Sequence, residues 1–461
     1  MKSSKVLGAL VTLGLAAAVA TPAMALEHQF SGAFTSFYDL SNYTAAGNDG
    51  SASNNMGLLK SAPTENYFVQ RVRLGYTAKA SEDVKLVTKF ELDYNYIGNS
   101  SYVAGRGSGG ALGADSINLE TKNLYLDLNV TKSLNAKIGM QGYNDAFKGV
   151  IFDADMAGIL LSHEYANAGV TAGLFRFNES NANALGKHTR DMLTLDGKYS
   201  ISKVIKIGAA YYYITDNSDN GSTTTTVQNG NPVLGLYSAD GTPVYDKPAT
   251  VTTTKNPDNA LKVHTLGLNA EAAVGPVTLT GFALAQFGDL NKTTDAKGYA
   301  FNLGAKIPVG AGTARAEFLY VPGGKNALNV VPGEGGAFYD NEMIILSRDK
   351  NATTIDNAIV SDVNNFGQGV IFGSVGFDFP LTAKLSGSVN VGAAEVAKDL
   401  AKHKSKYLGT ELNCEANYKF NTAVTLGVRA GYVVLGDYFK PAVGTTPDDP
   451  YDVKLIAKYS F

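Results

Sequence analysis

Hydrophobic and polar residues alternate along most of the chain. In VKLVTKFELDYNY (84–96) every second residue is apolar or aromatic, with one threonine, and the positions between them are mostly Lys, Glu, Asp and Asn. The segments 423–436 and 451–461 repeat this scheme. A period of two residues is typical of β-strands with one apolar and one polar face, whereas a helix would scatter the charges around its circumference. The pattern therefore predicts an all-β protein.

The connections between these segments alternate in length. Short turns such as KASEDVK and NVTKSLNAK follow longer polar stretches at 40–64, 98–115, 216–260, 323–366 and 439–450, which we expect to be exposed loops. Short turns at one end and long loops at the other are typical of a transmembrane antiparallel β-barrel, with the turns in the periplasm and the loops outside the cell.

About 18 strands fit the pattern, and 16 is the alternative because the first strand and the region 341–348 are ambiguous. We predict strands at 27–39, 65–80, 84–97, 116–130, 135–143, 158–166, 169–178, 190–200, 203–215, 261–274, 277–288, 297–308, 312–322, 367–380, 382–396, 404–419, 423–436 and 451–461.

Charge decides which face of each strand meets lipid. A Lys or Arg on the lipid face at mid-membrane costs about 2–4 kcal/mol, so the charged faces are expected to point into the lumen. A barrel of this size leaves an aqueous channel. Cys414, the only cysteine, is in phase with apolar residues and is predicted to face lipid. The predicted lumen residues are Arg71, Arg73, Lys85, Lys89, Glu91, Asp93, Arg176, Arg315, Glu317 and Arg429.

The N-terminus predicts export. Lys2 and Lys5 precede an apolar run that ends in Ala23-Met24-Ala25, which indicates a secretory signal peptide cleaved after Ala25. Residues 26–461 would then form a single barrel domain in the bacterial outer membrane. The formal charge of −3 argues against a nucleic-acid partner. The five histidines are dispersed and form no paired metal spacing, so we predict no enzyme, no metal site and no cofactor.

AKIGMQGYNDAFKGVIFDADMAGILLSHEY (136–165) resembles a segment of the Gram-negative porin family. In that family a strand close to KIGMQ precedes a loop that folds into the barrel and narrows it, and acidic loop residues face basic residues on the opposite wall. By position, the resemblance implies an acidic side of Asp145, Asp153 and Asp155, and a basic side of Arg71, Arg73, Lys89 and Arg429. The alternative is that Asp153 and Asp155 only solvate an exposed loop.

The chain ends in YDVKLIAKYSF (451–461), which is predicted to be the last strand and to pair with the strand at 27–39. Closure of the barrel leaves no free edge there. The terminal Phe461, with Tyr459 two residues earlier, resembles the signal that the barrel-assembly machinery reads in outer-membrane proteins.

The resemblance implies a water-filled channel for passive diffusion of small hydrophilic solutes and ions. It also implies a homotrimer surrounded by outer-membrane lipid and lipopolysaccharide. The signal peptide and loops further resemble porins of metal-respiring deltaproteobacteria. This favours a second hypothesis, a structural protein that supports envelope integrity and extracellular electron transfer beside neighbouring c-type cytochromes. A third, an adhesin, would use the loops at 216–260 and 323–366.

Overall fold

The computed structural model describes residues 26–43, 58, 64–97, 119–179, 185–217, 223–228, 232–237, 243–245, 250–255, 261–331, 339–347, 358–360, 362–400, 403, 405–440 and 446–461. The predicted signal peptide at 1–25 lies outside these residues, as does most of the predicted loops at 40–64 and 98–115.

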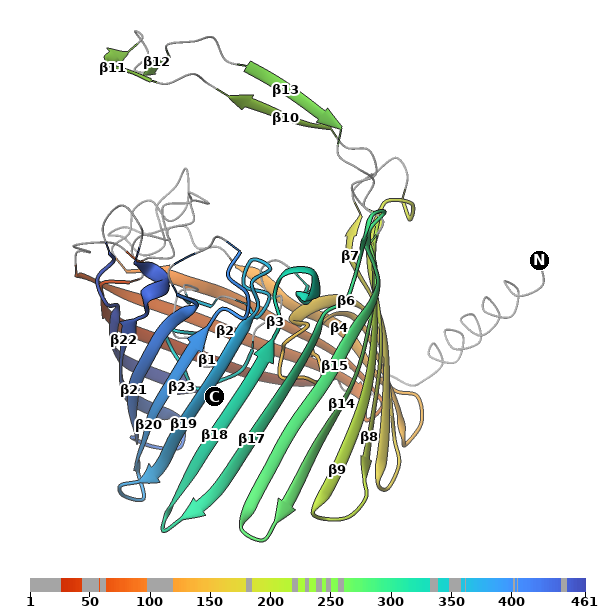
Figure 1. Cartoon of the computed structure of the whole chain (residues 1–461). Helices are drawn as coiled ribbons and strands as arrows, with labels where there is room; N and C mark the ends of the chain where they lie inside the picture. The colour runs from red at the N-terminus through yellow and green to blue at the C-terminus, as the bar shows by residue number, and fades with distance from the viewer. Residues whose placement is uncertain are drawn as a thin grey trace, which may run out of the picture.

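In the described part of the chain, eighteen long antiparallel strands close into a barrel, as predicted (Figure 1). Each barrel strand pairs with the next one along the chain, and β1 pairs with β23 to close the sheet. The strands are β1 Glu27–Ser41, β2 Glu65–Ser81, β3 Val84–Tyr96, β4 Glu120–Asn129, β5 Leu134–Asn144, β6 Asp153–Glu164, β7 Ala168–Glu179, β8 Thr189–Ser200, β9 Ile205–Asp216, β14 Leu261–Val274, β15 Val277–Asn291, β17 Tyr299–Val309, β18 Gly312–Val321, β19 Val370–Pro380, β20 Leu385–Glu395, β21 Tyr407–Lys419, β22 Val424–Leu435 and β23 Tyr451–Ser460.

The remaining elements are short. β16 (Thr294–Asp295) pairs with the end of β15, and two 3-10 turns, η3 (Gly324–Asn326) and η4 (Asp437–Phe439), lie in loops. Between β9 and β14, β10 (Thr223–Gln228) pairs with β13 (Thr250–Lys255), and β11 (Pro232–Tyr237) pairs with β12 (Pro243–Tyr245), in two small sheets apart from the barrel sheet. Among the described residues, no helix has the length and apolar character needed to cross a bilayer.

The predicted strand ranges agree with the structure to within a few residues, with one larger difference. β6 begins at Asp153, five residues before the predicted start, because its pairing with β5 continues up to the Asn144–Asp153 pair. The ambiguous first strand is β1, while the described residues 341–347 contain no extended strand. The number of barrel strands is therefore 18 and not 16.

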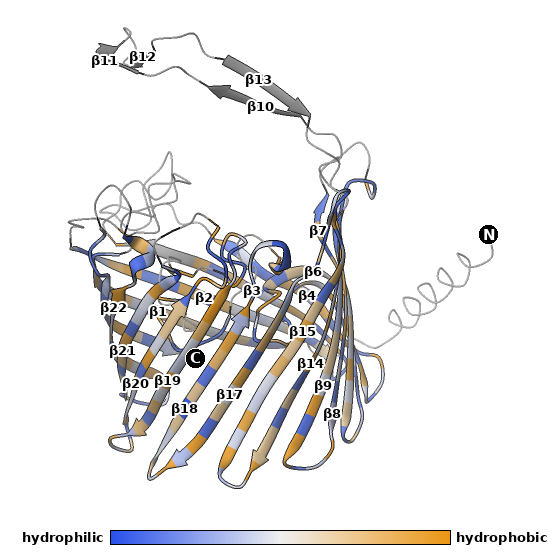
Figure 2. Ribbon diagram, viewed as in Figure 1, coloured by the Kyte–Doolittle hydropathy of each residue, from blue (hydrophilic) through white to orange (hydrophobic). Residues whose placement is uncertain are grey.

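Alternate positions of each strand face outward and are apolar. On β21, Leu412 is 59% exposed and Cys414 is also exposed, whereas the alternating positions Glu411 and Asn413 are buried. Figure 2 shows the corresponding alternation of hydrophobic and hydrophilic residues along the strands. Aromatic pairs such as Phe301 with Tyr320 lie on this outer face, in the manner of a membrane girdle.

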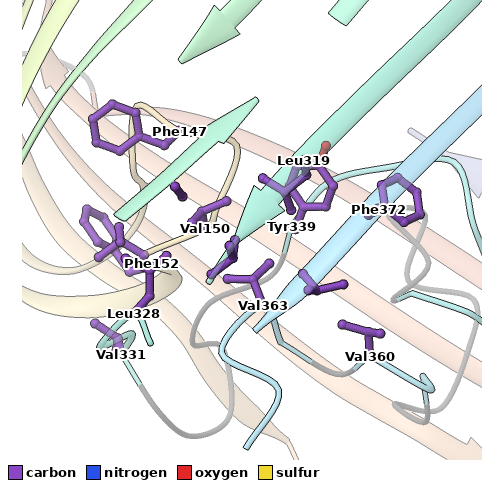
Figure 3. Packing of buried hydrophobic residues seen from close by; sticks show 14 of the residues in the cluster. Phe147, Val150, Phe152, Leu319, Leu328, Val331, Tyr339, Val360, Val363 and Phe372 are labelled. Atoms are coloured by element: carbon purple, nitrogen blue, oxygen red, sulfur yellow. The ribbon is translucent and has the colours of Figure 1, made fainter. Parts of the chain in front are cut away.

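The interior corrects the expectation of a uniformly polar lumen. On β18, Leu319 and Val321 are fully buried, while Phe318, which precedes Leu319, is 37% exposed on the outside. Inward positions of β19 and β22, such as Phe372 and Val433, are also buried. Segments of two loops cover these apolar inward positions (Figure 3).

We name these segments the first inward loop (residues 145–152, between β5 and β6) and the second inward loop (residues 322–369, between β18 and β19). Of the second loop, residues 322–331, 339–347, 358–360 and 362–369 are described. The prediction that 323–366 is exposed is therefore wrong for Met343, Ile345 and Val363, which are at most 2% exposed. These residues are apolar, but the sequence does not show which wall strands lie opposite them, so their burial against the wall was not predicted.

Candidate functional site

The first inward loop is organised around Asp145, the residue that follows β5. Its carboxylate accepts hydrogen bonds from the backbone N–H groups of Phe147 (2.6 Å), Gly149 (3.0 Å), Ile151 (2.5 Å) and Phe152 (2.8 Å). Burial raises the pKa of Asp145 to about 6, against the lowering effect of these four bonds. The prediction that Asp145 presents its charge to the lumen is wrong, because the loop wraps around its carboxylate.

Aromatic packing holds this loop against the barrel wall. The Phe147 ring contacts Phe282 on β15, with 5.5 Å between ring centroids, and Phe152 lies edge-on to Tyr212 of β9 at 5.0 Å. The Tyr212 hydroxyl accepts the N–H of Ala146 at 2.8 Å. Phe147 and Phe152 have no exposed surface, so the loop is folded into the barrel as the porin resemblance implied.

A second carboxylate holds the second inward loop. Glu411, on β21, accepts three consecutive backbone N–H groups, from Ile344 (2.8 Å), Ile345 (3.0 Å) and Leu346 (2.6 Å). Its side chain is fully buried and also accepts Asn413 Nδ2 at 2.7 Å. The wall strand thus supplies the anion that satisfies the loop's convergent N–H groups.

The two loops join each other inside the barrel. Val331 N–H donates to the Ile151 carbonyl at 3.0 Å, and Asp340 N–H donates to the Lys148 carbonyl at 3.2 Å. Lys148 Nζ forms an ion pair with Glu317 on β18 and lies 5.1 Å from the centre of the Tyr339 ring. Lys148 therefore connects the first loop both to the second loop and to the wall.

A cavity of about 770 Å³, lined by both charged and apolar residues, lies beside this junction. Arg315 borders it and pairs with Glu342 of the second loop at 2.9 Å and with Asp378 on β19 at 2.6 Å. Arg315 and Glu317 share the inward face of β18 with Leu319, as predicted from their phase. Further charged residues along the cavity are Lys148, Lys198, Lys206, Glu271, Lys306 and Asp340.

A cationic cluster lies on the strands from β2 to β4. Arg71 pairs with Glu91 at 2.7 Å, and Arg73 binds the other oxygen of the same carboxylate. Lys122, on β4, lies 3.9 Å from Glu91 and pairs with Asp155 of β6 at 2.7 Å. Asp155 is therefore near the predicted basic residues Arg71 and Arg73, and Lys122 lies between Asp155 and the Glu91 carboxylate that both arginines bind.

Lys89 belongs to the same cluster, because it interacts electrostatically with Arg73, Lys122, Asp155 and Glu91. Arg71, Arg73, Lys89 and Lys122 thus lie around the carboxylates of Glu91 and Asp155. Asp153 is the first residue of β6, opposite Asn144 of β5. Asp93 lies on β3, but its side chain falls outside the described part of the structure.

Arg429 lies apart from this cluster. On β22 it pairs with Glu415 through Nε at 2.7 Å, and β23 and β1 separate it from β2. Arg429 therefore faces the lumen, as predicted, but it belongs to another part of the wall than Arg71.

Arg176 corrects another prediction, because it lies on the outer face of β7. It shares that face with Leu174 (56% exposed), whereas the neighbouring Phe175 is buried inside. Arg176 is close to the end of β7 and pairs with Asp191 at 2.8 Å. The phase was misassigned because a charged residue was expected to face the lumen, while a paired charge at a barrel rim avoids the cost of the membrane interior.

Sequence reasoning missed Lys122, Lys148, Tyr339 and Glu411. Glu411 occupies an inward position of a predicted strand, and this was the only signal available, since its loop partners are more than 60 residues away. Among the described residues, no group of three or more His, Cys, Asp or Glu side chains is arranged to hold a metal ion.

Comparison with known proteins shows which solved structures have a similar fold. No family model and no curated protein match the sequence. Several solved structures are similar: Pseudomonas aeruginosa OpdL (12% identity, TM-score 0.56, covering 94% of this chain and 99% of that one) and Acinetobacter baumannii OccAB4 (13% identity, TM-score 0.55, covering 96% and 100%). The outer membrane protein opdK from Pseudomonas aeruginosa has 11% identity and a TM-score of 0.53, covering 94% and 98%. The protein thus has the same barrel fold as these structures over almost its whole length.

Proposed function

We propose that the protein is an outer-membrane porin, a water-filled channel for passive diffusion of small hydrophilic solutes and ions. The observation that carries this proposal is a cavity of about 770 Å³, bordered by several charged residues, in a closed barrel and beside two loops that fold inward. An apolar outer face suits lipid, and charged inward residues suit a hydrated path. The similar solved structures, one of them named an outer membrane protein, support the same compartment.

The inward loops and the cationic cluster would together form the constriction. Asp155 on β6 and Lys122 on β4 form an ion pair across β5, and Arg71 and Arg73 continue the same charged stretch of the wall. Charges that line a narrow gap set up a local field, which screens solutes by size and charge. Because the cluster holds four named cations beside the carboxylates of Glu91 and Asp155, it favours anions over cations at this level.

Reconstitution tests the proposal. Purified protein in planar bilayers is expected to give ohmic single-channel steps, and a salt gradient is expected to give a reversal potential that favours anions. A barrel that inserts, shows the heat-dependent gel shift of a folded β-barrel and yet conducts no ions would contradict the proposal.

The surroundings of the channel follow from the same resemblance. We propose a cleaved signal peptide, assembly of residues 26–461 by the barrel-assembly machinery through Tyr459 and Phe461, and a homotrimer embedded among lipopolysaccharide. Tyr459 and Phe461 are both exposed on the outer face at the closing strand, which is where an assembly factor could reach them. Cross-linking in native membranes tests the trimer.

The finer resemblance, to porins of metal-respiring deltaproteobacteria, carries the scaffold hypothesis. The similar solved structures reported above come from Pseudomonas and Acinetobacter and lend it no support. A deletion strain separates the two functions: reduced uptake of small solutes supports the channel, while normal uptake with lost extracellular reduction supports the scaffold.

A further inference from the structure

We infer that Asp145 and Glu411 are the positioning residues of the constriction: each carboxylate holds one inward loop inside the barrel through backbone N–H groups, and together they determine how wide the channel is. This inference rests on the proposed function where it concerns channel width. Its structural part, the retention of the loops, does not depend on conduction.

Both carboxylates are enclosed by donors and withdrawn from the lumen. Asp145 is 7% exposed and Glu411 has no exposed surface. Each oxygen of Asp145 accepts two N–H groups, and the oxygens of Glu411 accept three N–H groups and one side-chain amide. Neither group is therefore placed to contact a passing solute.

The loops need these carboxyl groups as hydrogen-bond acceptors because of their backbone geometry. In the first loop, Lys148 and Gly149 have positive φ angles of 64° and 78°, and this turn directs several N–H groups toward one point. In the second loop, three consecutive N–H groups converge on Glu411. Convergent N–H groups form an anion site, and a buried one without an anion leaves several donors unsatisfied.

Asp145 and Glu411 lie in different parts of the chain, but the two loops that they hold contact each other. Asp145 is on the stem of the loop that it holds, whereas Glu411 is on a wall strand and holds a loop whose contacts lie 65 to 67 residues away in sequence. The loops meet at Lys148 and Val331. Loss of one carboxylate should therefore loosen its own loop strongly and the other loop less.

Hydrogen exchange provides the first readout. In Asp145→Ala, we expect amides 147–152 to exchange at least about tenfold faster, because four buried donors lose their acceptor. In Glu411→Ala, amides 344–346 should change in the same way. Glu415→Ala is the matched control: Glu415 is an inward carboxylate on the same strand as Glu411, but it pairs with Arg429 instead of a loop, so both loops should keep their protection.

Chemical rescue separates positioning from a general loss of structure. Acetate has the size of the group removed in Glu411→Ala, and formate has that of the group removed in Asp145→Ala. We expect acetate, compared with chloride at equal ionic strength, to restore protection of amides 344–346 in Glu411→Ala and to leave Glu415→Ala unchanged. A variant that is merely misfolded would not recover with a small carboxylate.

Single-channel recording provides the second readout. Both alanine variants are expected to show larger and noisier conductance with an unchanged reversal potential, because the bore changes while the charged wall does not. Unchanged exchange and unchanged conductance in both variants would overturn the inference. If wild-type protein conducts nothing, the proposed function fails, but the exchange and rescue experiments still decide whether these carboxylates hold the loops.

Discussion

Phe461, the last residue, pairs with Gly32 on the first strand. Gly32 N–H donates to the Phe461 carbonyl at 2.9 Å, and Phe461 N–H donates to the Gly32 carbonyl at 3.0 Å. The Phe461 ring covers the position that a side chain at 32 would occupy. Tyr459 stacks on Phe461 with 5.4 Å between ring centroids. The chain end is thus a fitted part of the closing seam.

Gly32→Val should impair barrel closure, because its side chain and the Phe461 ring would occupy the same space. We expect a smaller fraction of the heat-shifted folded form after refolding into detergent. Gly197→Ala is the control, since the nearest atom to its new methyl group lies 3.8 Å away. Equal folded fractions for Gly32→Val and wild type would show that the ring can move aside without cost.

Lys454 should be essential to the stability of the same seam. It pairs with Asp39 at 2.9 Å and with Asp452, and all three side chains are at most 1% exposed. Lys454→Met leaves two buried carboxylates without their cation, and loss of one partner of such a group costs about 3–5 kcal/mol. Denaturant unfolding in lipid vesicles measures this.

Lys206→Met is the control for that experiment. Its ion pair with Glu271 is about half exposed on both sides, and exposed pairs contribute at most about 1 kcal/mol. Adding Asp39→Asn and Asp452→Asn to Lys454→Met should recover part of the lost stability. No recovery would mean that packing of the lysine stem, and not charge, accounts for the loss.

The first inward loop should be held more firmly in mild acid. Burial raises the pKa of Asp145 from its ordinary value of 3.8 to about 6, so the folded-in loop binds a proton more tightly than a detached loop does. Its stability therefore rises as pH falls from about 7 to about 4, by about 3 kcal/mol in total, and this gain is lost as pH rises through about 6. Protection of amides 147–152, corrected for the intrinsic exchange rate, should follow this curve.

Asp145→Ala provides the check on that titration, because it should abolish the pH dependence of these amides. Amides 344–346, which bind Glu411 instead, report whether the effect is local to the first loop. A loop that loosens on acidification would show that loss of hydrogen-bond strength outweighs the relief of charge burial.

Asp155→Asn should shift the reversal potential further toward anions. It removes a carboxylate from a cluster that contains Arg71, Arg73, Lys89 and Lys122, so the formal charge of the cluster becomes more positive by one unit. Lys89→Gln should shift the potential in the opposite direction. Arg176→Gln should leave it unchanged, because Arg176 is on the outer face of β7. A shift with Arg176→Gln would contradict that placement.

The sequence by itself determined the strands, their number to within one hairpin and the faces they present. Alternation is a local property, since each residue's environment depends on its parity along the strand and on the high cost of charge in lipid. The closing pair of β1 with β23 also followed, because a barrel in a membrane cannot leave an edge. Arg176 was assigned to the wrong face because a charge near the barrel rim does not bear the cost of the membrane interior. There, only the position of the residue along the strand determines which face it lies on.

The tertiary structure decided what lies inside the barrel. Glu411 and Ile345 are bound to each other across 66 residues, and Lys148 meets Tyr339 across nearly two hundred. No local pattern encodes such contacts, because they arise only once closure brings opposite strands to face each other. The same closure explains why Asp145, which was predicted to lie on the acidic side of the constriction, is the buried centre of its loop.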